Sequence, residues 1–515
     1  MGNQTLPLHE QMFPVVETST GRIRGLANEG VHIFRGIPYG EDTGARRFQP
    51  PRPRAPWAGV RDCLGPGPVA PQVSLPLTSI FSQLLHYEMT VADGGMSEDC
   101  LTLNVWTGGV NDGGRRPVVV LLHGGGYAHS SANSPLYDGA LLALEQNVVV
   151  VGINHRLGSL GYLGLAGLNL SERFEAAGHC GLLDIILALR WLRDNAEVFG
   201  ADPGRVTLMG ESGGGWKVSA LMAMPGAHGL FHRAVVQSGS GPGPLDEEQG
   251  AALAAVLLKT LDLARCDAET LLALDYTRLL AAQSMIGAVA FMPLLHPIAL
   301  PAQPLDPAGL AVSRDVPLIV ATTLDDAGLF FTHFDLDEPG LKALLHQQYG
   351  DAAGDLLALY RAHRPDKSPY LLHAEMITDA GFRRYAHAHA EGKASLGGAP
   401  VWTYRWDWPS PAWDGQFGAA HSMDVPASLA HSRDSLLGAG VAPARRLAAA
   451  LSSAIAAFAA DGDPASPLLP EWPDYTGKAR HCLILGESDH VASAPDPDLR
   501  AAWEALMPAP RGLFG

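Results

Sequence analysis

Long apolar runs in the middle of the chain are the strongest constraint on its fold. Val118–Leu122 and Val148–Ile153 contain no charged side chain, and each run is bounded by polar residues or glycines. Strands that are covered on both faces have this composition, and they occur in parallel sheets. Leu136–Glu145, between the two runs, and Leu182–Trp191, after them, have the pattern of helices. The alternation predicts an α/β fold with a large, mostly parallel central sheet flanked by helices.

Strand-like runs continue this alternation toward the C-terminus. Between residues 246 and 390 the chain is mostly helical and rich in alanine and leucine, so we expect a helical excursion over one edge of the sheet and over the active site. We find no repeat, low-complexity tract or long linker, so we expect one domain over residues 1–515. The further predicted strands are Val206–Met209, Leu318–Thr322, Val401–Asp407 and Cys482–Leu485, and residues 14–40 add short β-like runs.

The acidic charge balance limits the classes of partner. The 515 residues include 53 acidic and 36 basic side chains, a formal net charge of −17. No Lys- and Arg-rich run could neutralise phosphates, so we expect neither nucleic acid nor an anionic membrane surface as a partner. The longest uncharged helix-like stretch, Leu447–Ala460, has 14 residues and is too short to cross a bilayer. The first 17 residues show no signal sequence, which predicts a cytoplasmic protein.

The cysteines form no recognisable site. They are five in number, widely spread, and lack a CxxC pair. This pattern indicates neither a zinc site nor a disulfide framework, so we expect reduced, structural thiols and no metal. The five are Cys63, Cys100, Cys180, Cys266 and Cys482.

A serine between glycines follows one of the predicted strands. Gly210-Glu-Ser212-Gly-Gly214 comes directly after Val206–Met209 and precedes a helix-compatible segment. A nucleophile elbow needs this pattern, because the serine backbone is strained and bulky neighbours would clash. The alternative is a glycine-rich turn with a solvent-exposed serine.

The turn after Val118–Leu122 favours the catalytic interpretation. His123-Gly-Gly-Gly126 follows that strand directly, and its N–H groups can point at a carbonyl oxygen that gains negative charge during acyl transfer. Esterases and lipases have such HGGG turns. The turn lacks the lysine of a phosphate-binding loop. The two motifs together predict a serine hydrolase.

A serine hydrolase of this kind also needs an acid and a histidine base, in the chain order Ser, Asp or Glu, His. Asp325 and Asp326 follow a predicted strand, and the residue pattern leaves open which of the two is the acid. His421 follows the strand Val401–Asp407 and a loop rich in proline, glycine and tryptophan. His431 is the nearest alternative base, and we expect it on a helix.

With these parts in place, the chain resembles the bacterial type-B carboxylesterases, the family that includes para-nitrobenzyl esterases and, more distantly, cholinesterases. The resemblance implies an α/β-hydrolase fold and a carboxylesterase for small-molecule esters that needs no cofactor. The matching motifs are FRGIPYG (34–40), SEDCLTLNVW (97–106), HGGGY (123–127), SPLYDG (134–139), NHRLGSLGYL (154–163), FGADPGRVTLMGESGGG (199–215), LFHRAVVQSGS (230–240) and DGDPASPLLPEWPDY (461–475).

The resemblance also implies catalytic roles, residue by residue. Ser212 matches the nucleophile and His421 matches the base. TTLDDAGLFF (322–331) is similar to the acid loop of the family, which puts Asp326 at the usual glutamate. The oxyanion hole is matched by the N–H groups of Gly125, Gly126 and Gly213.

Residues near these motifs are candidates for positioning the triad and for binding substrate. Glu211 resembles a buried glutamate of the family that tunes the electrostatics of the site; the alternative is a charge at a helix N-terminus. Ser238 resembles a serine that supports the triad by hydrogen bonding; the alternative is a plain turn. Five apolar side chains could line the pocket or simply belong to the core: Trp216, Met285, Phe291, Phe330 and Trp413.

Three positions depart from the family pattern. Asp326 is one methylene shorter than glutamate, and triads use either residue. Gly213 stands where alanine is commoner, which should loosen the elbow slightly. Ala70 stands where the family has a disulfide partner for Cys100, so we expect no disulfide there, as in a reducing compartment.

The sequence therefore predicts a carboxylic-ester hydrolase that forms an acyl-enzyme on Ser212. A carbamate or amide hydrolase with the same triad is the alternative among enzymes. A non-catalytic binding protein on the same scaffold is the alternative from another class. The physiological ester and the oligomeric state do not follow from the sequence.

Overall fold

Eleven strands of the described chain form one mixed sheet. The computed structural model describes residues 12–73, 95–168, 170–263, 268–287 and 289–507. In chain order the strands of this sheet are β3 (Leu26–Asn28), β4 (Val31–Pro38), β6 (Thr102–Thr107), β7 (Arg116–Leu122), β8 (Val149–Ile153), β9 (Ala201–Glu211), β10 (Arg233–Gln237), β11 (Leu318–Thr323), β12 (Val401–Trp406), β13 (His481–Leu485) and β14 (His490–Ser493).

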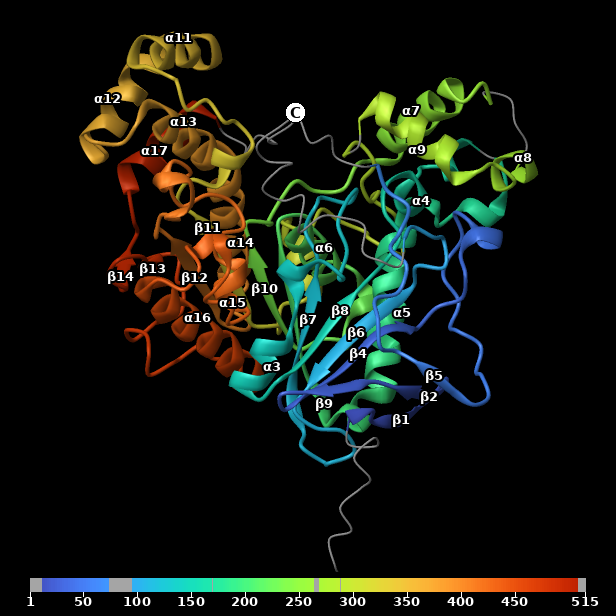
Figure 1. Cartoon of the computed structure of the whole chain (residues 1–515). Helices are drawn as coiled ribbons and strands as arrows, with labels where there is room; N and C mark the ends of the chain where they lie inside the picture. The colour runs from blue at the N-terminus through green and yellow to red at the C-terminus, as the bar shows by residue number, and fades with distance from the viewer. Residues whose placement is uncertain (1–11, 74–94, 169, 264–267, 288, 508–515) are drawn as a thin grey trace, which may run out of the picture.

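The sheet runs through the whole molecule (Figure 1). Its spatial order is β14-β13-β12-β11-β10-β9-β7-β8-β6-β4-β3. All neighbours from β8 to β13 are parallel, and antiparallel pairs lie toward both edges. A small second sheet near the N-terminus consists of β1 (Val15–Thr18), β2 (Gly21–Arg24) and β5 (Val60–Asp62). The predicted mostly parallel sheet is confirmed.

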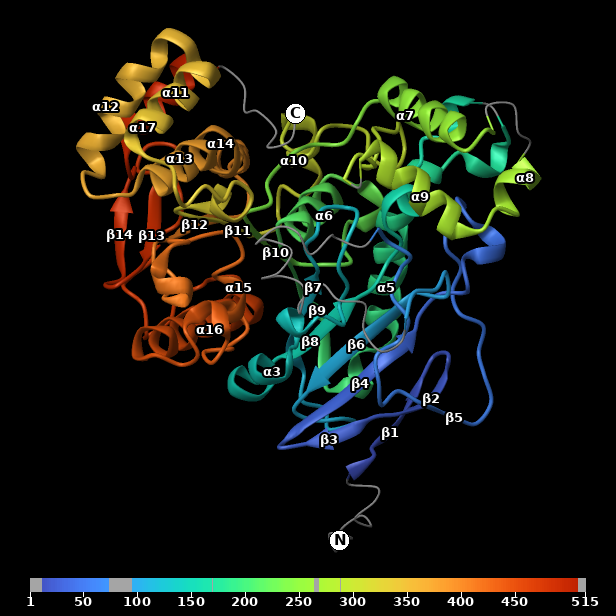
Figure 2. The ribbon, with the colours of Figure 1, turned by 45° about the horizontal axis from the view of Figure 1, so that its top comes forward.

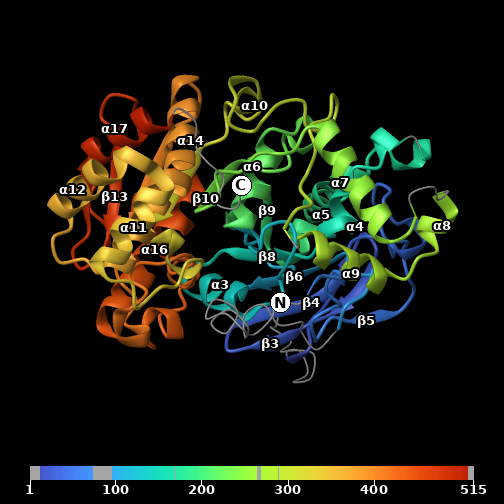
Figure 3. The same cartoon turned by 90° about the horizontal axis from the view of Figure 1, so that it is seen from above.

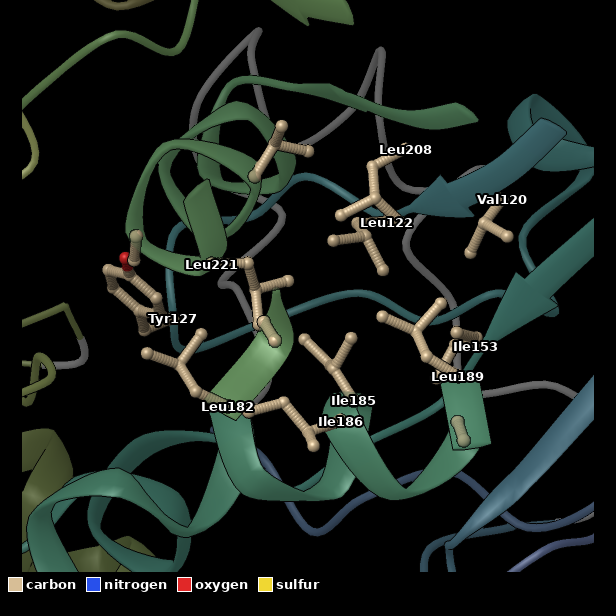
Figure 4. Close-up of a cluster of buried hydrophobic side chains, with 14 of the residues drawn as sticks. Val120, Leu122, Tyr127, Ile153, Leu182, Ile185, Ile186, Leu189, Leu208 and Leu221 are labelled. Atoms are coloured by element: carbon tan, nitrogen blue, oxygen red, sulfur yellow. The ribbon is translucent and has the colours of Figure 1, made fainter. Parts of the chain in front are cut away.

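Helices cover both faces of the sheet, which explains the apolar runs. Side chains on β7 alternate between two core clusters, because successive residues of a strand point to opposite faces. Val120 and Leu122 pack in one cluster with Leu182 and Leu221, which belong to α5 (Cys180–Asn195) and α6 (Gly213–Met222), as Figure 4 shows. Residues of α3 (Ala140–Gln146) and α16 (Ala442–Asp461) belong to the cluster on the other face.

Two helix predictions need correction or refinement. The predicted helix Leu136–Glu145 is shorter, because Asp138 is extended and only α3, from Ala140, is α-helical. The uncharged stretch Leu447–Ala460 lies inside α16, which packs against the sheet. Among the described residues, no helix is both long and apolar enough to cross a membrane.

The helical middle of the chain forms two groups instead of one excursion over one edge. One group contains α7 (Glu247–Thr260), α8 (Ala268–Leu272) and α9 (Tyr276–Ile286), and the other lies on the opposite side of the molecule, with α6 between them (Figures 2 and 3). The two groups are separated in the chain by β11, which pairs between β10 and β12 in the interior of the sheet. The second group is α11 (Glu338–Tyr349), α12 (Ala353–His363), α13 (Pro369–Thr378) and α14 (Arg384–Ser395); the remaining helices are α4 (Gly158–Tyr162), α10 (Pro307–Val312), α15 (Val425–Ser428) and α17 (Pro497–Leu506).

Candidate active site

Ser212 occupies a sharp turn between β9 and α6. Its backbone has φ 55° and ψ −124°, a region that residues with a side chain rarely adopt. The turn is held by hydrogen bonds from Ser212 N to Gln237 O (2.9 Å) and from Trp216 N to Ser212 O (3.0 Å). A β-carbon at Gly214 would overlap the carbonyl oxygen of Leu122, so only glycine lets α6 approach β7 this closely. The turn thus has the strained geometry of a nucleophile elbow.

An acid and a histidine meet in the loops that follow β11 and β12. Nδ1 of His421 donates to Oδ1 of Asp326 at 2.7 Å, and both side chains are buried. Oδ2 of Asp326 accepts from Ser238 Oγ at 2.9 Å and from the N–H of Thr323 at 3.0 Å. These bonds fix the carboxylate, which in turn fixes the ring, and Nε2 has no hydrogen-bond partner among the described residues.

Glu211 lies on the other side of the imidazole. Its Oε1 is 3.0 Å from Nε2 of His421 without the alignment of a hydrogen bond, and it accepts from Ser422 Oγ at 2.7 Å. Burial raises the pKa of Glu211 to about 7. Burial lowers the pKa of His421, but the carboxylates of Glu211 and Asp326 more than reverse this and raise it to about 9.

Three N–H groups lie together beside the elbow. Gly125 and Gly126 follow β7 with φ of 78° and 61°, and Gly213 is the first residue of α6. Within the described ranges, these three N–H groups donate to no protein acceptor. A β-carbon at Gly213 would overlap the backbone of Gly126, so the helix and the turn are in direct contact. The helix and the turn are therefore closely packed at Gly213.

Comparisons with known proteins place these features in one family. The model of the carboxylesterase family matches residues 13–499. The chain belongs to the carboxylesterase family. This carboxylesterase is 34% identical to phenmedipham hydrolase of Pseudarthrobacter oxydans over 92% of the chain and 95% of that protein. It is 33% identical to para-nitrobenzyl esterase of Bacillus subtilis over 94% of the chain and 97% of that protein.

Solved structures give the same assignment for the fold. The carboxylesterase EST55 of Geobacillus stearothermophilus superposes with a TM-score of 0.81 at 32% identity, over 95% of this chain and 99% of that chain. A para-nitrobenzyl esterase superposes with a TM-score of 0.77 at the same identity and over the same shares of the two chains. The expected family, α/β-hydrolase fold and carboxylic-ester hydrolase activity are confirmed.

The five apolar pocket candidates of this carboxylesterase lie in different surroundings. The ring of Phe330 lies 5.0 Å from that of His421, and the ring of Trp216 lies 5.9 Å from that of Tyr127, which follows the HGGG turn. Phe291 is fully buried in a core cluster. The other two side chains are exposed, by 81% for Met285 and 53% for Trp413.

Asp325 and His431, the alternatives to Asp326 and His421, form hydrogen bonds with other partners. The carboxylate of Asp325 pairs with Lys367 and accepts the N–H of Ala419 at 3.1 Å. The ring of His431 donates from Nε2 to the carbonyl of Asp138 at 2.7 Å. His431 follows the end of α15 and is not helical, so its expected position on a helix is wrong.

The sequence motifs missed one contact of the imidazole and one partner of Glu211. The ring of Phe382 lies 5.1 Å from that of His421 and stacks with that of Phe330 at 6.1 Å, so two neighbouring phenyl rings contact the imidazole. Ser422, the residue after the base, bonds Glu211 from a backbone with φ 66°. No local signal marks Phe382, which comes from the helical region. Among the described residues, no group of three His, Cys, Asp or Glu side chains could hold a metal ion.

The described cysteines are unpaired. Four thiols are free and buried, and Cys266 lies outside the described residues. Cys100 and Ala70 belong to the same core cluster, so the position that would carry a disulfide partner is filled by an apolar side chain. Burial raises the pKa of Cys63 to about 12 and that of Cys180 to about 11, which keeps these thiols protonated.

Proposed function

We propose that this carboxylesterase cleaves carboxylic esters in two steps on Ser212. Nε2 of His421 takes the hydroxyl proton, and Oγ of Ser212 bonds to the ester carbonyl carbon. The carbonyl oxygen gains the negative charge and is stabilised by the N–H groups of Gly125, Gly126 and Gly213. The C–O bond to the alcohol breaks, and the alcohol leaves with the proton from His421. Water then repeats both steps and releases the acid.

The contact between His421 and Asp326 is the observation that carries this proposal. The hydrogen bond of 2.7 Å occupies Nδ1, so Nε2 is the nitrogen that can exchange a proton with Ser212. The carboxylate stabilises the imidazolium that forms when the serine gives up its proton. The strained backbone of Ser212 supports the role of nucleophile, because an elbow of this kind presents its Oγ to substrate.

Small-molecule esters and a cytoplasmic location complete the proposal. Phe330 and Phe382 beside the base provide apolar surface for an acyl or alcohol group. The free, buried thiols are compatible with a reducing compartment. The net charge of −17 disfavours nucleic acid and anionic membranes as partners.

Covalent labelling tests the nucleophile directly. A fluorophosphonate probe labels the wild-type enzyme, and Ser212→Ala is expected to abolish the label and to lower kcat by roughly 10³-fold or more. Ser219→Ala is the matched control, because Ser219 lies on the same helix and bonds Gly239 O instead of facing the base. A label that persists on Ser212→Ala would refute the assignment.

A substrate panel tests the reaction class. Nitrophenyl esters of increasing acyl length should be hydrolysed with a defined optimum, and kcat/KM for a matched carbamate and anilide should be lower by at least tenfold. A higher kcat/KM for the carbamate or the anilide would show that the enzyme is a carbamate or amide hydrolase with the same triad. Subcellular fractionation tests the location, and recovery of the enzyme outside the cytosol would contradict that part.

A further inference from the structure

Lys217 is a fully buried lysine on the helix that begins at the proposed nucleophile. Its side chain has no exposed surface, and Nζ donates to the carbonyl oxygen of His123 at 2.8 Å. Within the described part of the chain, no carboxylate lies within ion-pair distance of Nζ. Burial lowers the pKa of Lys217 to about 7, and the nearby charge of Glu211 opposes this change. Burying a lysine without an ion-pair partner costs desolvation free energy, and the hydrogen bond to His123 offsets part of that cost.

The acceptor of that bond is the first residue of the turn that carries two oxyanion donors. We call residues 123–126 the oxyanion loop. Nζ of Lys217 also lies 5.9 Å from the ring centre of Tyr127, the residue that follows the loop. Tyr137 Oη accepts from the N–H of Gly124 at 2.7 Å and holds the outer side of the loop. The hydrogen bond from Lys217 joins the first residue of this loop to α6.

Gly213 and Lys217 are four residues apart on α6, so they lie on one face of the helix. This face is turned to the oxyanion loop. At Gly213 the helix touches the backbone of Gly126 with no side chain between them, and at Lys217 it bonds His123. The spacing between the third oxyanion donor and the other two therefore depends on how firmly the loop is held to this face.

We propose that Lys217 is a positioning residue that ties the oxyanion loop to α6 and thereby sets the spacing of the three oxyanion N–H groups. This inference rests on the proposed two-step mechanism. Lys217 touches neither substrate nor base in this scheme. It acts through the loop, where a displacement below 1 Å is enough to weaken hydrogen bonds to an oxyanion.

The test compares two buried lysines that each donate to a backbone carbonyl. Lys217→Met keeps the length of the side chain and removes the donor. Lys393→Met is the matched control, because Lys393 is also buried and also bonds a backbone carbonyl, that of Ser313, on α14 away from the triad. Both variants should lose thermal stability, so a purely structural role predicts the same behaviour for both.

The readouts are kcat, KM and the inhibition constant of a trifluoromethyl ketone, which forms a tetrahedral adduct whose oxygen lies in the oxyanion hole. Lys217→Met should lower kcat by about 10²- to 10³-fold, the effect of losing one oxyanion donor, and leave KM within about threefold. Affinity for the ketone should fall in parallel with kcat, because both depend on the tetrahedral state. Lys393→Met should keep kcat and ketone affinity.

Three results would overturn the inference: unchanged kcat in folded Lys217→Met, a rise in KM alone, or equal losses of kcat in both lysine variants. If Lys217→Met does not fold, Lys217→Gln replaces it, because the amide nitrogen of glutamine lies one bond nearer the helix than Nζ of lysine. This variant should also lower kcat and leave KM nearly unchanged. Fluorophosphonate labelling of wild-type Ser212 separates the two proposals. Label on another residue refutes the mechanism, whereas normal label with normal Lys217→Met kinetics refutes only the role of Lys217.

Discussion

Asp325 and Asp326 are adjacent in the chain, yet their carboxylates belong to separate hydrogen-bond networks. Asp326 bonds His421, whereas Asp325 pairs with Lys367, which also binds Glu375 at 2.7 Å. The helical turn after β11 begins at Asp326, and this change of direction separates the two side chains. One carboxylate therefore faces the imidazole of His421, and the other is linked through Lys367 to Glu375 on α13.

This divergence predicts unequal effects of two otherwise identical substitutions. Asp326→Asn should lower kcat by roughly 10⁴-fold, because the amide cannot hold the imidazole in the productive tautomer. Asp325→Asn should retain most of kcat and lower the melting temperature, because it weakens the link to Lys367. Steady-state kinetics of the two purified variants checks the ranking. A larger loss of kcat in Asp325→Asn would contradict the assignment of Asp326 as the acid.

Glu211 should control the pH dependence of the enzyme. In the proposed mechanism the imidazole accepts a proton from Ser212 only when it is neutral, so kcat/KM should rise with pH through the raised pKa of His421. The carboxylate of Glu211 favours the imidazolium, so Glu211→Gln should lower that pKa and move the acid limb to lower pH. Ser422→Ala removes a hydroxyl that stabilises the charge of Glu211 and should cause a smaller shift in the same direction.

The profiles are measured by pH-stat titration of the released acid, so that ionisation of a chromogenic leaving group does not distort them. An acid limb that stays in place, or moves to higher pH, in Glu211→Gln would show that Glu211 does not set the protonation of the base.

Gly213 gives a counterintuitive prediction, because the residue commoner in the family should harm this enzyme. The added methyl group of Gly213→Ala would overlap the backbone of Gly126 and displace the oxyanion loop. We expect kcat to fall by about 10²-fold or more with little change in KM. Gly354→Ala, at a helical position with open space around it, is the control and should keep full activity. An unchanged kcat in Gly213→Ala would show that the oxyanion loop can move to accommodate the methyl group without loss of catalysis.

The thiols predict indifference to reductants. The four described cysteines are free, and a disulfide that closes a loop of tens of residues would contribute about 3–4 kcal/mol. Excess dithiothreitol should therefore change neither the melting temperature nor kcat. Five thiols should react in denaturant, including Cys266. A lower melting temperature after reduction, or fewer than five thiols, would reveal a disulfide.

Most of the central sheet could be predicted because its strands are buried on both faces and carry a strong local signal. The boundaries of the strands could not be predicted in the same way. For example, β9 begins at Ala201, five residues before the apolar run that predicted it. The strand Leu318–Thr322 was predicted inside the helical region, but its place between β10 and β12 depends on pairing with strands distant in sequence. The separation of the helices into two groups was therefore not predicted. In the site, motifs marked Ser212 strongly. They marked neither Phe382 nor Lys217, whose positions arise only from tertiary packing.

The position of the triad on the sheet has a consequence for biosynthesis. Asp326 and His421 are 95 residues apart, and the bond between Ser422 and Glu211 spans 211 residues. Contacts this distant in sequence form late, because the intervening chain must first be ordered. Recovery of hydrolysis during refolding should thus lag behind the formation of helices. On the ribosome, Ser212 should remain inert until the chain as far as His421 has emerged and folded, so an unfinished chain should have no hydrolase activity.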